Sequence, residues 1–329
     1  MRRLIIDETC LNLFIDTKEF KDILNFLKDL CQSQDMTSED KDFSELSNLC
    51  KFLDTLISNV LEYQCPISSS RYGDHSFRNW LESIDQSVQF FLSSQISNNL
   101  LRAEIHEYFV KSLGSRERLD YGTGHELNFI CFMYCLKLEG ILQPDLYAFC
   151  VQEVFLRYWD LVRSVQKKFL LEPAGSLGVW GLDDYNYLPF LFGAAQLRNH
   201  KYLKPCSVLD PYLIEQYQST YIYFKAIYNM STDSEVHLRE RSPILYDITC
   251  VKSWDKVYKG LFRMYENNVL RKLPVMQHFY FGEMIPFKHT GCDISEHLIH
   301  DHNGDCCGNR IPSIHSLSKA SNSYKYPMD

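Results

Sequence analysis

The stretch ELNFICFMYCLKLEGIL, residues 126–142, decides the fold. Apolar side chains lie almost all round a helix drawn through it, so neighbouring elements have to cover that helix on most sides. It therefore predicts the centre of a large helical core. Length and composition agree with this, because the 329 residues are 45% hydrophobic and 23% charged, as in ordinary globular proteins.

Amphipathic helices are expected on both sides of this centre. Apolar residues recur at intervals of three and four along six further stretches. Thr17 stands in the capping position of the first stretch, and the pair Pro144-Asp145 begins the fourth. The six stretches are residues 17–30, 46–60, 76–91, 144–171, 212–228 and 253–269.

Strand signals are weak, and only residues 278–281 alternate convincingly between apolar and polar side chains. The predicted fold class is therefore all-α, with at most a small β-hairpin. From Lys288 onward the chain is rich in His, Asn, Ser, Asp and Gly and has few large apolar residues. This composition predicts one helical domain over residues 1–287 and a polar, disordered tail over residues 288–329.

Charge and composition exclude several classes of protein. A net charge of -8 argues against a nucleic-acid partner, because binding phosphates requires a clustered excess of Lys and Arg. No apolar run reaches the roughly 18 residues of a membrane-spanning helix. The N-terminus lacks the core of a signal peptide, so we expect a cytoplasmic protein, with the nucleus as a second location. The thiols should then be reduced, with Cys131, Cys135 and Cys150 buried as small hydrophobes.

The first segment that could carry chemistry is RLDYGTGHE, residues 118–126, which leads straight into the central helix. Amide groups at a helix N-terminus attract anions, glycines let a phosphate approach the backbone, and Arg118 could neutralise its charge. The alternative is a tight turn in which Asp120 or Thr123 caps the helix. The segment is not a P-loop, because no Gly-Lys-Ser/Thr follows.

The second segment is EPAGSLGVWGLDDY, residues 172–185, in which three glycines recur at every third position. The glycines keep the backbone low enough for a ligand to lie across it. The adjacent carboxylates of Asp183 and Asp184 could hold a magnesium ion that also takes phosphate oxygens. The alternative is an acidic helix N-terminus with no ligand at all.

The third segment is PVMQHFYFG, residues 274–282. Gln277 and His278 could hydrogen-bond a base or ribose while Phe279 stacks on it, although a histidine among aromatic residues is more often part of a core. The tail also raises a weak zinc hypothesis, because its spacing lacks a paired pattern. The tail residues concerned are Cys292, His297, His300, His302, Cys306 and Cys307.

Together with LPFLFGAAQL at residues 188–197, the first two segments closely resemble the signature blocks of the phosphotyrosyl phosphatase activator (PTPA) family. Weaker similarity extends over residues 5–290. The resemblance implies an all-helical fold of core, linker and lid subdomains with a peptide groove between them. It also implies ATP and magnesium at a site shared with the catalytic subunit of protein phosphatase 2A.

Each functional residue of the family can be carried onto this chain by its place in the motifs. The nucleotide contacts would be Arg118, Thr123 and Gly124, with a second group from residues 277–279. The magnesium-side and catalytic positions would be Gly178, Asp184 and Tyr187, with Gly178 and Asp184 nearest the metal. The second nucleotide group is Gln277, His278 and Phe279.

The resemblance further implies an activator of phosphatase 2A that is a peptidyl-prolyl cis/trans isomerase. Its partners would be the phosphatase catalytic subunit, with the scaffold subunit as a further candidate, and a proline-containing peptide. A non-enzymatic chaperone that stabilises active phosphatase and promotes metal loading is the alternative. Either function requires the glycine-bearing turns at residues 122–124 and 175–181 to converge in one recess beside Asp184.

Overall fold

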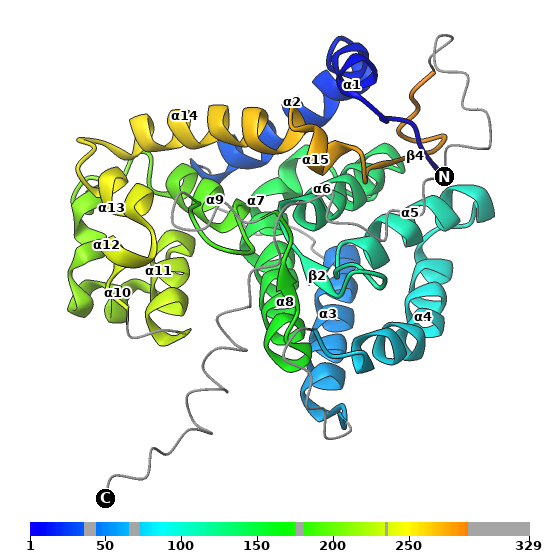
Figure 1. Cartoon of the computed structure of the whole chain (residues 1–329), viewed down its shortest axis with the longest axis horizontal. Helices are drawn as coiled ribbons and strands as arrows, with labels where there is room; N and C mark the ends of the chain where they lie inside the picture. The colour runs from blue at the N-terminus through cyan, green and yellow to red at the C-terminus, as the bar shows by residue number, and fades with distance from the viewer. Residues whose placement is uncertain (36–43, 66–72, 176–180, 234–235, 289–329) are drawn as a thin grey trace, which may run out of the picture.

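The computed structural model describes residues 1–35, 44–65, 73–175, 181–233 and 236–288, and over these ranges the chain is mainly helical, with strands of two residues each (Figure 1). The predicted all-α fold is confirmed. Its first half contains β1 (Arg2–Arg3), α1 (Glu8–Ile15), α2 (Lys18–Gln32), η1 (Ser33–Asp35), α3 (Ser44–Glu62), α4 (Ser76–Gln95), α5 (Asn99–Lys111), β2 (Asp120–Tyr121), α6 (Thr123–Leu138), η2 (Pro144–Leu146), α7 (Tyr147–Phe149), η3 (Cys150–Phe155) and α8 (Leu156–Phe169). The second half contains β3 (Glu172–Pro173), α9 (Leu188–Gln196), η5 (Pro205–Leu209), α10 (Pro211–Tyr217), α11 (Ile222–Asp233), α12 (Leu238–Arg241), α13 (Pro243–Thr249), α14 (Trp254–Tyr265), η6 (Glu266–Leu270), α15 (Leu273–Met276) and β4 (Tyr280–Phe281).

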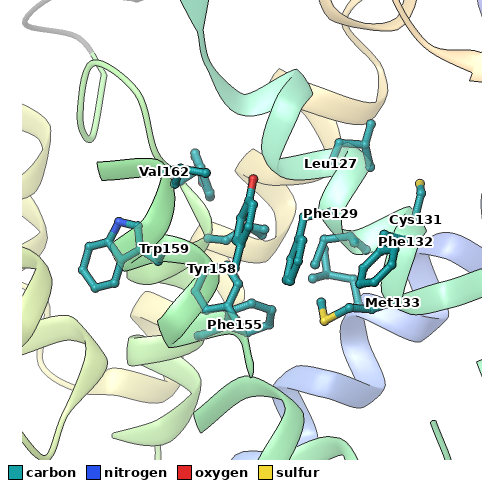
Figure 2. Packing of buried hydrophobic residues seen from close by; sticks show 14 of the residues in the cluster. Leu127, Phe129, Cys131, Phe132, Met133, Phe155, Tyr158, Trp159 and Val162 are labelled. Carbon is teal, nitrogen blue, oxygen red and sulfur yellow. The ribbon is translucent and has the colours of Figure 1, made fainter. Parts of the chain in front are cut away.

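Helix α6 forms the centre of the core, as its sequence predicts. Every residue from Glu126 to Leu136 is buried, and α2, α5 and α15 pack around it. Figure 2 shows Phe129 of α6 lying face to face with Tyr158 of α8, with their ring centroids 3.6 Å apart. Aromatic rings thus join the central helix to the long helix beside it.

Helix boundaries follow the apolar pattern in the first part of the chain. Helices α2, α3 and α4 occupy the three predicted stretches, and the Thr17 hydroxyl accepts the Phe20 amide at 3.2 Å as a cap. The stretches at 144–171 and 253–269 are helical too, but each contains a π-helical segment, η3 or η6.

The prediction of one continuous helix over residues 212–228 was wrong. Helix α10 ends at Tyr217 and α11 begins at Ile222. The Gln196 side chain of α9 receives the Ile222 amide at 2.9 Å and donates to the Thr220 carbonyl at 3.1 Å. These hydrogen bonds satisfy the backbone groups that the break releases, so tertiary contact stabilises the turn.

The strands pair segments that are distant in sequence, whereas the sequence suggested a hairpin. Strand β1 pairs antiparallel with β4, with Arg2 opposite Phe281. Strand β2 pairs parallel with β3, with Asp120 opposite Glu172. The second pair places the first two candidate segments side by side.

Beside β4, a buried carboxylate fixes the chain that follows the third candidate segment. The Glu104 side chain on α5 accepts the backbone amides of Glu283, Met284 and Ile285 at 2.7 to 3.2 Å. A Cβ at Gly282 would lie only 2.3 Å from this carboxylate, so glycine is needed for the close approach. Residues 282–285 are therefore fixed against α5.

The described cysteines are all free thiols, and Cys131, Cys135 and Cys150 are fully buried, as expected. Within the described ranges no helix is long and apolar enough to cross a membrane. The tail predicted at residues 288–329 lies outside the described residues except for Lys288, and the zinc candidates from Cys292 to Cys307 lie outside them with it.

Candidate functional site

The short parallel pairing of β2 with β3 brings the first two candidate segments into contact. Backbone hydrogen bonds join the Glu172 amide to the Leu119 carbonyl at 2.9 Å and the Ala174 amide to the Tyr121 carbonyl at 2.7 Å. A Cβ on Gly122 would lie 2.5 Å from the Ala174 carbonyl oxygen, so only glycine permits this approach. The close contact with the second turn thus explains why the first turn has glycine at position 122.

Helix α6 begins directly at this junction. Gly122 is its N-cap and supplies no side-chain acceptor, so the first amide groups of a long helix are left without a side-chain cap. In the alternative interpretation of this segment, Asp120 or Thr123 would cap the helix. Neither side chain does so. Amides of this kind, with the positive end of the helix dipole, form a site for an anion.

A cavity of about 600 Å³ opens in front of these amides. Thr123 and Gly124 line it from α6, Arg118 from the turn, and His278 and Phe279 from the third segment. All five are among the predicted nucleotide contacts. The sixth, Gln277, is not among the described lining residues, and its amide donates to the Pro274 carbonyl at 3.4 Å.

The Phe279 ring belongs as much to the core as to the cavity. It is only 3% exposed and stacks on Phe14 with centroids 6.5 Å apart, while Phe281 meets its edge at 5.0 Å. The predicted stacking on a base would therefore involve only the part of the ring that reaches the cavity wall.

Arg118 is the centre of a charged cluster in the wall of this cavity. Its Nε donates to Asp120 at 2.7 Å, and its Nη1 lies 3.4 Å from Nδ1 of His278. Burial disfavours the charged form of Asp120, but hydrogen bonds and charges of His125 and Arg118 outweigh burial and lower the pKa of this carboxyl.

The pKa of His278 is also lowered, but for a histidine this favours the neutral form, whereas Asp120 stays charged. Burial and the neighbouring positive charges of Arg118 and Arg3 lower the pKa of His278 to about 3. The ring is therefore neutral at physiological pH. Since a guanidinium can only donate, Nδ1 accepts from Arg118 and the ring proton lies on Nε2.

A second, smaller cavity of about 60 Å³ adjoins the first. Asp184 and Gly181 line it from the second segment, and Gly175, Thr123 and Lys272 line both cavities. Thr123 of the first glycine-bearing turn and the described ends of the second, Gly175 and Gly181, meet in one recess beside Asp184, as the sequence predicts. Gly178 lies outside the described residues, so its predicted role next to the metal has no structural description.

The two neighbouring aspartates have different surroundings. Asp183 accepts the backbone amides of Tyr185 and Asn186 at 3.3 and 3.1 Å, and Arg241 lies 3.8 Å away. It therefore stabilises the turn that precedes α9. Asp184 instead lines the smaller cavity.

Tyr187 also lines the smaller cavity, but its hydroxyl donates to the Leu261 carbonyl of α14 at 2.9 Å. Burial raises the pKa of this phenol well above its ordinary value. The hydroxyl thus anchors α14 and is not poised to transfer a proton. Its ring and backbone remain as the parts that shape the recess.

Glu126 is a buried residue behind the two cavities that the sequence did not single out. Its Oε2 accepts the Tyr187 and Leu188 amides at 2.7 and 3.2 Å, so one side chain of α6 caps α9. Its Oε1 is buried with no hydrogen-bond partner among the described residues. Burial raises the pKa of Glu126 to about 8, although the two amides act in the opposite direction. The only available signal was an acid at the start of an otherwise apolar helix.

Lys272 is the second residue that pattern analysis missed. It precedes α15, lines both cavities, and is the one cation among the described residues that line the smaller cavity. Nothing in the local sequence marks it, because its position depends on how α15 packs against α6. It adds a positive charge at the junction of the two cavities.

Comparison with known proteins agrees with the geometry. The family model described as "Phosphotyrosyl phosphate activator (PTPA) protein" matches residues 1–287. Curated relatives named "Serine/threonine-protein phosphatase 2A activator 2" include that of Candida albicans, 38% identical over 92% of this chain and 90% of the relative, and that of Schizosaccharomyces pombe, 38% identical over 99% and 96%. The crystal structure of the PP2A phosphatase activator Ypa1 PTPA1 superposes with a TM-score of 0.75 at 29% identity, over 85% of this chain and 92% of that one. The chain belongs to the PTPA family.

Proposed function

We propose that this protein activates protein phosphatase 2A and catalyses cis/trans isomerisation of a prolyl bond, with ATP and magnesium bound at a site completed by the phosphatase catalytic subunit. The activator part rests on the names of relatives that align along nearly the whole chain. The observation that carries the rest is the convergence of the Gly122 and Gly175 turns on two adjoining cavities.

The larger cavity fits a nucleotide in size and chemistry. Its wall combines a helix N-terminus at Thr123 and Gly124 with the positive charges of Arg118 and Lys272, which suits phosphate groups. The cavity is partly open to solvent, so a partner surface could enclose the ligand. This geometry favours a composite site over tight binding by the free chain.

Magnesium is compatible with the same arrangement. No group of three metal-ligating side chains occurs among the residues that the structure describes, so they do not form a closed protein cage. Magnesium usually keeps several waters and takes only one or two carboxylates with nucleotide phosphates, and Asp184 would be that carboxylate. When bound, the ion would neutralise phosphate charge next to the smaller cavity.

Isomerisation requires little chemical machinery. Rotation about an X-Pro bond crosses a barrier of roughly 18–20 kcal/mol, and a site that binds the twisted amide better than either planar form lowers it without a nucleophile. Buried walls such as those of Leu182 and Val269 exclude water from the smaller cavity. Thr123 and Asp184 provide polar groups that would orient the peptide backbone.

The function is tested by comparing wild type with Asp184→Ala in two assays, prolyl-peptide exchange measured by NMR and activation of purified phosphatase 2A in ATP and magnesium. We expect exchange and activation to fall together, because both depend on the recess beside Asp184. Undiminished exchange in the variant would remove Asp184 from the mechanism. Full activation by a variant without isomerase activity would replace this proposal with the chaperone function.

Replacing Arg118 with alanine should weaken ATP binding measured in the presence of the phosphatase catalytic subunit. Loss of one charge-assisted contact to phosphate costs about 1.5–3 kcal/mol, which is a tenfold to hundredfold fall in affinity. Arg116→Ala is the matched control, because Arg116 lines the same cavity but its ion pair is with Glu82 of α4, whereas the ion pair of Arg118 is with Asp120, next to the N-terminus of α6. Equal ATP affinity of wild type and Arg118→Ala in calorimetry would contradict the phosphate role.

A further inference from the structure

Another cavity lies away from the candidate site, among the helices α10 to α13 that form the left side of the molecule in Figure 1. Its volume is about 410 Å³, which is within the range of protein sites that hold ligands. Ile214, Ile227 and Met230 line it with apolar side chains. We refer to it as the α10–α13 cavity.

Apolar side chains continue from the cavity onto the surface. Leu209 and Val236 line it and are 43% and 49% exposed, although side chains of this type are usually covered. An apolar hollow with exposed apolar residues at its edge is typical of a surface that binds another polypeptide.

Two arginines and one acid are among the described residues that line this cavity, namely Arg239, Arg241 and Glu240. Arg241 is engaged within the fold, because it donates to the Met230 carbonyl at 2.5 Å and lies 3.8 Å from Asp183.

Arg239 is different, because its guanidinium lies over the Tyr246 ring at 5.4 Å. Among the residues that the structure describes, no carboxylate lies within ion-pair distance of it. An exposed guanidinium held on an aromatic ring beside an apolar hollow can pair with an incoming carboxylate.

The wall that carries these cations is fixed to the candidate site. The Ser242 hydroxyl, at the junction of α12 and α13, donates to the Gly181 carbonyl at 2.7 Å and accepts the Leu245 amide at 3.3 Å. These hydrogen bonds fix the junction of α12 and α13 in this wall, which lowers the cost of ordering that part of the wall when a peptide binds.

We propose that the α10–α13 cavity docks a short peptide segment of a partner protein, with a large apolar side chain in the hollow and an acidic side chain on Arg239. The apolar lining sets the first requirement, and the exposed Arg239 guanidinium, which has no carboxylate partner among the described residues, sets the second. This inference is independent of the proposed nucleotide and isomerase functions, because the described residues that line this cavity are not among those that line the other two.

The test is selection of a random dodecapeptide phage library on the full chain, followed by fluorescence polarisation with the enriched peptides. We expect enrichment of peptides that carry Asp or Glu close to a large apolar residue. Their affinity should fall by at least about tenfold for Arg239→Glu and for Val236→Asp. Both substituted side chains are exposed, so the variants should fold normally.

Lys256→Glu on α14 is the matched control, because it makes the same change in charge at an exposed lysine outside the cavity, and it should leave peptide affinity unchanged. No enrichment, enriched peptides that lack acidic residues, or equal affinity for wild type and Arg239→Glu would each overturn the proposal.

Discussion

Replacing Gly193 with alanine should destabilise the fold by at least about 2 kcal/mol. Gly193 lies in α9 where α11 crosses it, and a Cβ there would lie 2.3 Å from the backbone nitrogen and 2.6 Å from the Cα of Tyr223. The clash is with backbone, so no side chain can rotate away and the two helices must separate. The helix-propensity gain of about 1 kcal/mol for alanine offsets only part of this cost.

The separation would also disturb the aromatic contacts around that crossing. Tyr223 packs edge-on against Phe190 of α9 at 5.5 Å and against Trp254 of α14 at 4.7 Å. Moving its backbone therefore loosens three helices together. Equilibrium urea denaturation followed by circular dichroism measures the loss as a lower transition midpoint at an unchanged slope.

Gly260→Ala on α14 is the matched control for Gly193→Ala. A Cβ at Gly260 would meet no atom within 4 Å, so alanine there should stabilise the helix by up to about 1 kcal/mol. The two substitutions are chemically identical and should change stability in opposite directions. Equal effects would mean that α9 and α11 are not in backbone contact.

Local patterns predicted the elements whose structure depends on a single buried face. Helix α2 is an example, because its apolar stripe and the Thr17 cap are both local in sequence. The break between α10 and α11 could not be predicted, since the Gln196 side chain that stabilises it lies on another helix. The pairing of β1 with β4 could not be predicted for the same reason, because the two strands lie at opposite ends of the helical domain.

In the candidate site, too, features that are local in sequence could be predicted and features that depend on distant residues could not. The glycines of both turns were visible because they interrupt helical patterns, and their resemblance to family motifs linked them to one site. Glu126 and Lys272 were not visible, because their importance arises from what packs against them. The same holds for the Tyr187 hydroxyl, whose partner on α14 is far away in sequence.

The buried Glu126 carboxyl should make stability depend on pH. Its pKa is about 8 in the folded chain and near the ordinary value of 4.5 once unfolding exposes it to water. Between these values the folded state holds a proton that the unfolded state has released. The stabilisation that the protonated group contributes is therefore fully present below about pH 4.5 and is lost as pH rises through about 8.

Glu126→Gln should remove this dependence. A glutamine oxygen can still accept the Tyr187 and Leu188 amides, but the side chain never ionises. The free energy of unfolding of the variant relative to wild type should therefore rise by a few kcal/mol, on the order of 4, between pH 5 and pH 9. Urea denaturation of both proteins across this pH range measures the difference and cancels groups that titrate equally in both.

The test is how the difference in unfolding free energy between Glu126→Gln and wild type changes with pH, and not the value of this difference at one pH. The glutamine NH2 would take the place of an oxygen with no described partner, which adds a constant cost at every pH. Glu126→Ala is the companion variant, because it also cannot ionise but leaves both amides of α9 without an acceptor, so it should be less stable than Glu126→Gln throughout. Parallel curves for wild type and Glu126→Gln would show that the carboxyl does not hold its proton in the folded chain.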